Sequence, residues 1–270
     1  MTNNNYIKFW GIYDEIPSSK RYMSMFGNNT LCTEISIDGV NFIFDGGTGF
    51  YQYGNQFKKT NKKGIVNLFL TSTKWSNIQG IPHCNLILEK KNRVHIYCPD
   101  IFTKEPKELL SVLFQAPFFD KKANPIKGTV QYDTVNTGKK IFFDDIELST
   151  INLGSSVGYR IKFENIDVSY IRGFNPKKID TNELVEFIKD TKHLLMEGFF
   201  TENELEQKAN ENHCDINTAV KVMELSGSEN LYITSLAPDK KDTEIMSIEE
   251  KLYNINENIV FAKEESVISL

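Results

Sequence analysis

The segment that is most informative about the fold of this 270-residue chain is Leu70-Thr71-Ser72-Thr73-Lys74-Trp75-Ser76-Asn77-Ile78-Gln79-Gly80. It follows the segment from Gly64 to Leu70, a short and nearly continuous apolar run. Such a run is typical of a strand that is buried on both faces. The sequence therefore indicates a buried strand that ends at about Leu70 and continues into a polar loop from Ser72 to Asn77.

The frame of this stretch resembles the metal-binding signature of the metallo-β-lactamase superfamily, in which a buried strand ends in Thr-His-X-His-X-Asp-His. The positions that do not bind metal still fit, and they are Thr71, Trp75, Gln79, Gly80 and Pro82. The four ligand positions fall on Ser72, Lys74, Ser76 and Asn77. A hydroxyl, an ammonium and a carboxamide are poor zinc ligands, and a charged lysine repels a metal ion.

The resemblance extends from about Ile7 to the C-terminus. Within the superfamily, the chain is similar to the cyclic-nucleotide-phosphodiesterase-like branch. The matching segments are Lys8 to Gly11, Phe26 to Cys32, Phe42 to Gly49, Ala116 to Phe119, Val157 to Ile161 and Ile259 to Glu264. The resemblance implies one α/β domain over residues 1–270. Its expected architecture is a four-layer αββα sandwich, with two mixed sheets flanked by helices.

The later ligand positions of the family also carry side chains that do not bind zinc. They fall on Asn152 (Leu153 if the register shifts by one), Gly173 and Ser235. The resemblance therefore implies a site with no metal, no cofactor and no catalytic residue. Buried carboxylates without a metal would be uncompensated charges. Ser76 and Gly173, which replace aspartates, are expected to relieve that cost.

Four further residues are assigned to this pocket by the resemblance. Asp45 and Asn28 are expected to hold the loop from Ser72 to Asn77 in place. Arg172 and His213 are expected near Lys74, where they could hold an anion. A buried lysine can also act as a base or nucleophile when its pKa is lowered, whereas an exposed one pairs with a surface carboxylate. For His213 the alternative is a structural hydrogen bond at the start of the helix predicted from Asn217.

Composition limits the class of protein. A net charge of −5 argues against a dedicated nucleic-acid surface. No run of about 20 apolar residues is present and the start lacks a signal-peptide core, so we expect a cytoplasmic protein without a membrane segment. Four dispersed cysteines, which are Cys32, Cys84, Cys98 and Cys214, are expected to be reduced and mostly buried.

Periodicity predicts strands that alternate with helices. The predicted strands are 31–37, 40–45, 64–70, 140–151, 158–163, 166–171, 193–197, 231–234 and 258–262. The predicted helices are 104–114, 181–189, 201–210 and 217–225, with a solvated helix in the acidic stretch from Asp242 to Glu257. Gly46, Gly47 and Gly49 could form a phosphate-binding loop. That interpretation is rejected because no Walker lysine and no helix pattern follow.

Three functions remain open. The favoured one is a catalytically inactive protein that binds a protein partner or forms a homo-oligomer, because catalysis by this fold depends on metal-activated water. The second is a binder or sensor of a small anionic or nucleotide ligand at Lys74, Arg172 and His213. The third is a remodelled hydrolase or phosphodiesterase, for which Lys74 and His213 are the candidate ionisable groups.

Overall fold

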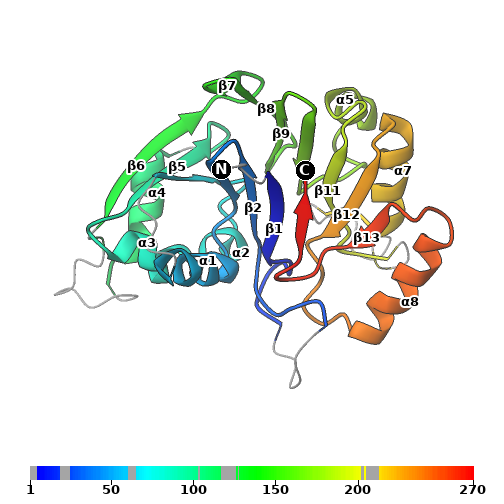
Figure 1. Cartoon of the computed structure of the whole chain (residues 1–270), viewed down its shortest axis with the longest axis horizontal. Helices are drawn as coiled ribbons and strands as arrows, with labels where there is room; N and C mark the ends of the chain where they lie inside the picture. The colour runs from blue at the N-terminus through cyan, green and yellow to red at the C-terminus, as the bar shows by residue number, and fades with distance from the viewer. Residues whose placement is uncertain are drawn as a thin grey trace.

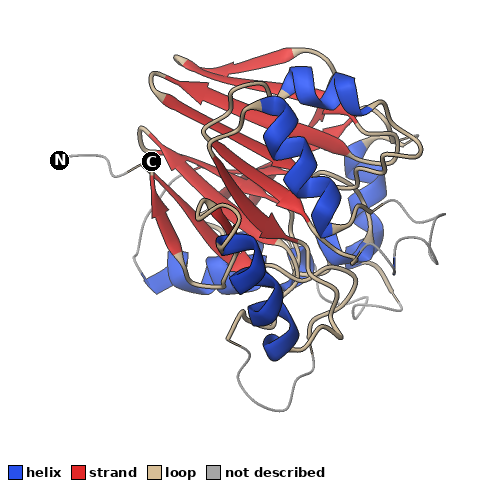
Figure 2. Ribbon diagram, turned by 90° about the vertical axis from the view of Figure 1, so that its right-hand side faces the viewer, coloured by secondary structure: helices blue, strands red, loops and turns tan. Residues whose placement is uncertain are grey.

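The computed structural model describes residues 5–18, 25–59, 65–102, 104–116, 126, 128–201, 204 and 213–270. These residues form two seven-stranded sheets that pack face to face, with helices on both outer faces (Figure 1). Seen from the side, the strands form parallel layers behind the helices (Figure 2). The predicted four-layer αββα sandwich with two mixed sheets is confirmed.

The first sheet has the strand order β14-β1-β2-β3-β4-β5-β6. Its strands, in that order, are Val267–Ser269, Tyr6–Gly11, Cys32–Ile37, Val40–Phe44, Ile65–Phe69, Arg93–Pro99 and Thr129–Val135. From β3 to β6, each strand pairs with the next in parallel. From β14 to β3, the three pairings are antiparallel. The C-terminal strand therefore closes the edge of the sheet beside the first strand of the chain.

The second sheet has the strand order β13-β12-β11-β10-β9-β8-β7. Its strands, in that order, are Ile259–Phe261, Asn230–Thr234, His193–Glu197, Ile166–Ile171, Val157–Phe163, Ile146–Asn152 and Lys140–Phe143. Strands β10 to β13 are parallel and β7 to β10 are antiparallel. The parallel part of each sheet is the part that carries helical connections, as parallel pairing requires.

Helices cover the outer faces. On the first sheet they are α1 (Thr48–Lys59), α2 (Trp75–Ile78), α3 (Asn85–Leu88) and α4 (Pro106–Ser111), with short 3₁₀ helices at Ile81–His83 and Val112–Phe114. On the second sheet they are α5 (Thr181–Phe187), α7 (Ile216–Ser226) and α8 (Asp242–Tyr253). No helix in the described ranges is both long and apolar enough to cross a membrane.

The interior is divided by the sheets into apolar layers. The first sheet sends Phe44 and Phe69 toward the second sheet, where Tyr159 packs against both rings. On its other face Leu68 belongs to a separate cluster beneath α1, whose Phe50 is also buried. This two-sided burial explains why the segment before the polar loop is an apolar run rather than an alternating one.

Several predicted elements differ from the observed ones. The predicted strand 140–151 is two strands, because Asp144 at φ 50° turns the chain between β7 and β8. The predicted helix 104–114 begins at Pro106, and helix 201–210 lies mostly outside the described residues. The part of the match at 117–119 also lies outside them. The N-cap of α5 is Asp180, which accepts from the backbone N–H of Asn182.

The glycine-rich turn after β3 is followed by α1, so the absence of a helix pattern was a wrong reason for rejecting a phosphate loop. The structure gives these glycines a different role. A Cβ on Gly80 would lie 1.8 Å from the carbonyl oxygen of Gly47, and one on Gly47 would lie 2.5 Å from that of Ser76. The glycines therefore let this turn and the polar loop approach backbone to backbone.

All four cysteines are free and buried. Burial raises the pKa of Cys98 to about 12, and it also raises the pKa of Cys84 to about 12 despite backbone hydrogen bonds that lower it. These thiols are therefore protonated core side chains at neutral pH. They leave the chemistry of the protein to the polar residues at the strand ends.

Candidate active site

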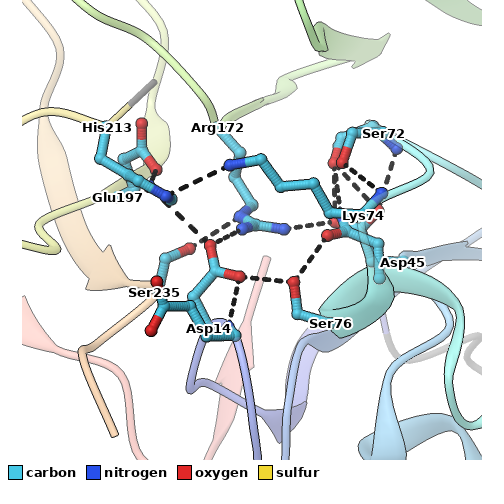
Figure 3. Close-up of polar contacts among 12 residues, drawn as sticks. Asp14, Asp45, Ser72, Lys74, Ser76, Arg172, Glu197, His213 and Ser235 are labelled. Carbon is cyan, nitrogen blue, oxygen red and sulfur yellow. Dashed lines mark hydrogen bonds and ion pairs between the residues drawn. The ribbon is translucent and has the colours of Figure 1, made fainter. Parts of the chain in front are cut away.

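Segments from both sheets meet at one set of strand ends (Figure 3). Asp45 follows β3 directly, Arg172 follows β10 and Ser235 follows β12. Asp45 and Ser235 adopt left-handed backbone conformations, with φ of 64° and 59°. Such conformations cost free energy in residues other than glycine and tend to occur at functional sites. Here they turn two polar side chains toward Arg172.

Arg172 lies at the centre of these contacts. Its Nη1 donates to Asp45 Oδ2 at 3.0 Å, its Nε donates to Ser235 Oγ at 2.7 Å, and its Nη2 pairs with Asp14 Oδ2. Arg172, Asp14, Asp45 and Ser235 are all buried. We call these four residues the arginine cluster. Its guanidinium joins side chains from both sheets in one hydrogen-bonded unit.

Asp45 also holds the polar loop. Its Oδ1 accepts from both the backbone N–H and the hydroxyl of Thr71 at 2.9 Å, and Asn77 Nδ2 donates to the Thr71 hydroxyl at 2.9 Å. The backbone N–H of Gly46 donates to the carbonyl of Asn77 at 2.6 Å. The loop from Ser72 to Asn77 is therefore fixed at both ends, in line with the support expected of Asp45.

Asp14 connects the same loop to the cluster. Ser76 donates its hydroxyl proton to Asp14 Oδ1, and the backbone N–H of Glu15 donates to the same oxygen at 2.6 Å. Burial by itself would raise the pKa of Asp14, but Arg172 above all, then His213, Lys74 and the Ser76 hydrogen bond, hold it well below its ordinary value. Asp14 is therefore a permanent carboxylate, and Ser76 serves it as a donor rather than as a nucleophile.

A second group of contacts extends from the cluster toward solvent. His213 Nδ1 lies 3.0 Å from Glu197 Oε2, and His213 Nε2 lies 3.2 Å from Lys74 Nζ. An ammonium only donates, so Nε2 is the acceptor and the ring proton is on Nδ1, facing Glu197. We call Lys74, His213 and Glu197 the histidine relay. Lys74 is exposed, whereas His213 and Glu197 are buried.

The surroundings of the relay fix the imidazole. Glu197 ends β11, and its other oxygen, Oε1, accepts from the backbone N–H of Phe174 at 2.8 Å. The ring of Phe199 stacks on His213 with centroids 4.4 Å apart and an interplanar angle of 19°. The buried Glu197 carboxylate and the stacked Phe199 ring hold the imidazole in one orientation, and Nε2 faces the exposed Lys74. A histidine held in this way can transfer a proton at Nε2.

Most of the predicted pocket residues do come together. Ser72 accepts at 3.3 Å from the backbone N–H of Lys74. Of the other predicted residues, Asp45, Arg172 and Ser235 belong to the arginine cluster, and Lys74 and His213 belong to the histidine relay. Ser76 and Asn77 contact Asp14 and Thr71, and Gly173 follows Arg172 in the chain. Arg172 is not available to an external anion, because its side chain is buried and each of its three guanidinium nitrogens already donates to Asp14, Asp45 or Ser235. The anion site predicted from three residues is therefore reduced to Lys74 and His213.

Two predicted residues lie outside these contacts. Asn152 is exposed, and its Oδ1 accepts from the backbone N–H of Gly154 at 2.7 Å. The backbone N–H of Asn28 donates to Glu264 Oε1 at 2.6 Å, and the buried Oδ1 of Asn28 has no hydrogen-bond partner among the residues that the structure describes. The structure therefore gives Asp45 the contacts expected of loop support but ties Asn28 to the C-terminal segment.

Asp14 and Glu197 are the residues that the sequence analysis missed. It expected the buried carboxylates to be lost together with the metal ligands, but Asp14, Asp45 and Glu197 are all buried. The Arg172 guanidinium pairs with the carboxylates of Asp14 and Asp45, and Glu197 pairs with His213. Glu197 carried one readable signal, since it ends the apolar run from His193 and a charge at that position needs a partner. Asp14 carried none, because its partners are distant in sequence.

The residues at the positions where the family holds its metal do not fit a metal ion, as the sequence analysis expected. Ser72, Lys74 and Ser76 offer hydroxyls and an ammonium, and the Arg172 guanidinium lies between two carboxylates beside them. A different group could hold a metal ion. One ligand atom each from Asp14, Glu197 and His213 lie within 4.8 Å of one another. In the structure these atoms are engaged with Arg172 and with each other.

No protein-family model and no curated protein sequence matches this chain. Solved structures do match it over nearly the whole length. The metallo-β-lactamase fold protein YhfI from Bacillus subtilis is 12% identical with a TM-score of 0.71, covering 98% of this chain and 99% of its own. A diphosphatase from the PhnP family is 12% identical with a TM-score of 0.72, covering 98% of both chains. The short form of human tRNase Z is 15% identical with a TM-score of 0.66, also covering 98% of both.

The sequence-based prediction of a protein that is not an enzyme is wrong. It depended on the absence of metal ligands, whereas the structure brings Asp14, Glu197 and His213 together in a buried group that could hold a metal ion. The structures that share the fold include proteins named as a tRNase and a diphosphatase. The predicted protein partner and homo-oligomer stay predictions.

Proposed function

We propose that this chain, which has the metallo-β-lactamase fold, is a hydrolase of small anionic esters of the phosphodiester class, with His213 as its general base. The observation that carries the proposal is the histidine relay, in which Glu197 holds one face of the imidazole and directs the lone pair of Nε2 toward Lys74. The names of the structural relatives, which include a diphosphatase, support this choice of substrate class.

The relay suggests how a substrate is recruited. Lys74 carries its ammonium on an exposed side chain, so an anionic phosphate group can approach it from solvent. The Lys74 ammonium has three donors and only one faces His213, so the other two can bind phosphate oxygens. A substrate that draws the ammonium away from the imidazole leaves the lone pair of His213 Nε2 for a water molecule.

The proposed reaction is a hydrolysis in which atoms and protons balance. His213 Nε2 takes a proton from the water while the water oxygen forms a bond to phosphorus and the ester P–O bond breaks. The leaving alkoxide receives the proton back from Nε2, which restores the neutral imidazole. Glu197 stabilises the imidazolium that exists between the two proton transfers, and Lys74 stabilises the charge on the phosphoryl oxygens.

The proposal is tested with bis(4-nitrophenyl) phosphate and 2′,3′-cyclic nucleotides, using protein freed of metal by a chelator and the same protein supplied with Zn²⁺ or Mn²⁺. We expect hydrolysis that falls by a factor of about 10² to 10⁴ in His213→Gln. His193→Gln is the matched control, because His193 lies on β11 beside Tyr232 and outside the relay. Hydrolysis that survives in His213→Gln, or that is absent in every condition, would contradict the proposal.

Binding without turnover is the second candidate function. It is supported by the exposed Lys74 ammonium beside His213, which is a site for an anion whether or not a bond is broken. Calorimetry with the same nucleotides distinguishes the two. Binding that is lost in Lys74→Met, with no product released by the wild type, would favour a sensor over a hydrolase.

A further inference from the structure

The arginine cluster places a fixed cation among carboxylates, beside the positions where the metallo-β-lactamase family carries its metal ligands. Arg172 donates directly to Ser235, one of the former ligand positions, and reaches Ser76, another, through their shared partner Asp14. Figure 3 shows the guanidinium between Asp14 and Asp45, with His213 and Glu197 on one side and the polar loop on the other. No other arginine or lysine in the described ranges pairs with either aspartate.

The buried charges show why a cation is needed there. Asp14 is 1% exposed, Asp45 and Glu197 are 0% exposed, and Arg172 is 3% exposed. Burial by itself would lower the pKa of Arg172, but the charge of Asp14, with Tyr170, Asp45 and Glu197, raises it above its ordinary value. The guanidinium is therefore positive at every pH at which the protein folds. Charges buried in this way persist only when they are paired.

We infer that Arg172 is a built-in cation that takes the place of a metal ion, and that removing its side chain converts the cluster into a divalent-cation site. Arg172 engages Asp14 Oδ2, the carboxylate oxygen that lies nearest to His213. Without the guanidinium, Asp14 is left to be neutralised by another cation. Asp14, Glu197 and His213 then present two carboxylates and one imidazole, a donor set suited to Zn²⁺, Mn²⁺ or Co²⁺.

The geometry of the remaining side chains favours binding of a cation in the space that Arg172 leaves. The ligand atoms of Asp14, Glu197 and His213 are already within 4.8 Å of one another, so they do not have to be gathered for binding. Three protein ligands leave further positions for water, which can enter the space of the deleted side chain. The inference does not rest on the proposed hydrolysis, since it concerns binding and stability.

The test compares wild type with Arg172→Ala after each is incubated with Zn²⁺ or Co²⁺ and desalted. We expect about one equivalent of metal in Arg172→Ala, a rise in its thermal midpoint of about 5 °C with metal, and visible absorption bands with Co²⁺. The wild type is expected to retain little metal and to show no shift. Equal retention by both proteins, or by neither, would overturn the inference.

Arg160→Ala is the matched control. Arg160 is also buried and pairs in bidentate fashion with Asp167, at 2.8 and 2.7 Å, but among the described residues Asp167 belongs to no group of three possible metal ligands. We expect the control to lose stability without gaining metal. If Arg172→Ala does not fold by itself, it is refolded from denaturant with and without Zn²⁺. Recovery only with Zn²⁺ supports the inference, and no recovery in either buffer contradicts it.

Discussion

The arginine cluster and the histidine relay share one set of strand ends but use charge in opposite ways. In the cluster, the donors of Arg172 have acceptors and the side chains are buried. In the relay, the chain of contacts ends on Lys74, which is exposed. A closed set of ion pairs holds segments together, whereas an open set can exchange one partner for a ligand.

Because the cluster is closed and the relay is open, the residues of the cluster are expected to control stability. Those at the open end of the relay are expected to control chemistry. Substitutions in the cluster leave a buried charge without a partner, so their effect is on the folded state. Substitutions at the open end of the relay remove a group that water can replace, so their effect is on binding or turnover. Glu197 lies between the two and should affect both.

The largest effect is expected from Arg172→Met. The substitution leaves Asp14 and Asp45 buried without their cation, and we expect a loss of about 3 to 5 kcal/mol in the free energy of unfolding. Urea denaturation measures it. Adding Asp14→Asn to Arg172→Met removes one of the two orphaned charges and should recover part of the loss. A single variant as stable as wild type would show that the cluster contributes little.

Glu197→Gln should separate the two roles of this residue. The amide can still accept from the N–H of Phe174, so we expect a stability loss of only about 1 to 2 kcal/mol. It no longer favours the proton on His213 Nδ1, and we expect turnover to fall by a factor of about 10² or more. Unfolding and initial-rate measurements on one preparation compare these effects. If the folded variant turned over substrate at the wild-type rate and lost only stability, Glu197 would serve the fold alone.

Acid should weaken the cluster through Asp14. Its pKa is lowered on folding, so its contribution to stability is complete above its unfolded value of about 4 and is lost as the pH falls toward the folded value. We expect the free energy of unfolding to fall more steeply below about pH 4 in wild type than in Asp14→Asn. Urea midpoints across that range provide the measurement. Parallel profiles would place the acid sensitivity elsewhere.

The smallest effect on stability is expected from Lys74→Met. Because the side chain is exposed, the free energy of unfolding should change by no more than about 0.5 kcal/mol. The affinity for a phosphate-bearing ligand should nevertheless fall by about a factor of ten, since one charged hydrogen-bond donor is lost. Calorimetry with a nucleotide gives the second value. A large loss of stability would place Lys74 in the closed half of the site.

The fold could be predicted well from particular segments. The apolar run before Leu70 predicted β4, because a strand buried on both faces is mostly apolar and only Asn67 interrupts this one. The predicted hairpin is β2 and β3, whose turn holds Asp38 at φ 47°. Helix α1 was not predicted, although Phe50, Tyr53 and Phe57 are buried along one of its faces, because Gly49 and Gly54 lie within it and glycine has a low helix propensity.

The candidate site could be predicted only in part. The position of the polar loop followed from its place at the end of β4, so Ser72, Lys74, Ser76 and Asn77 were located without a structure. The function of the loop was misjudged, because the sequence shows which ligands are absent but not which charges replace them. Asp14 and Arg172 are 158 positions apart in sequence, and no local pattern relates them.

Through its resemblance to a known family, the sequence implied the two-sheet sandwich and located the strand-end loop, and it carries no imidazole or carboxylate at the family's ligand positions. These inferences depend on short motifs and residue identity, which are local. Only the tertiary structure decided that Arg172 neutralises Asp14 and Asp45 and that Glu197 orients His213. Those pairings depend on which strand ends meet across the two sheets, and the free energy of a buried charge is set by the neighbours that folding brings to it.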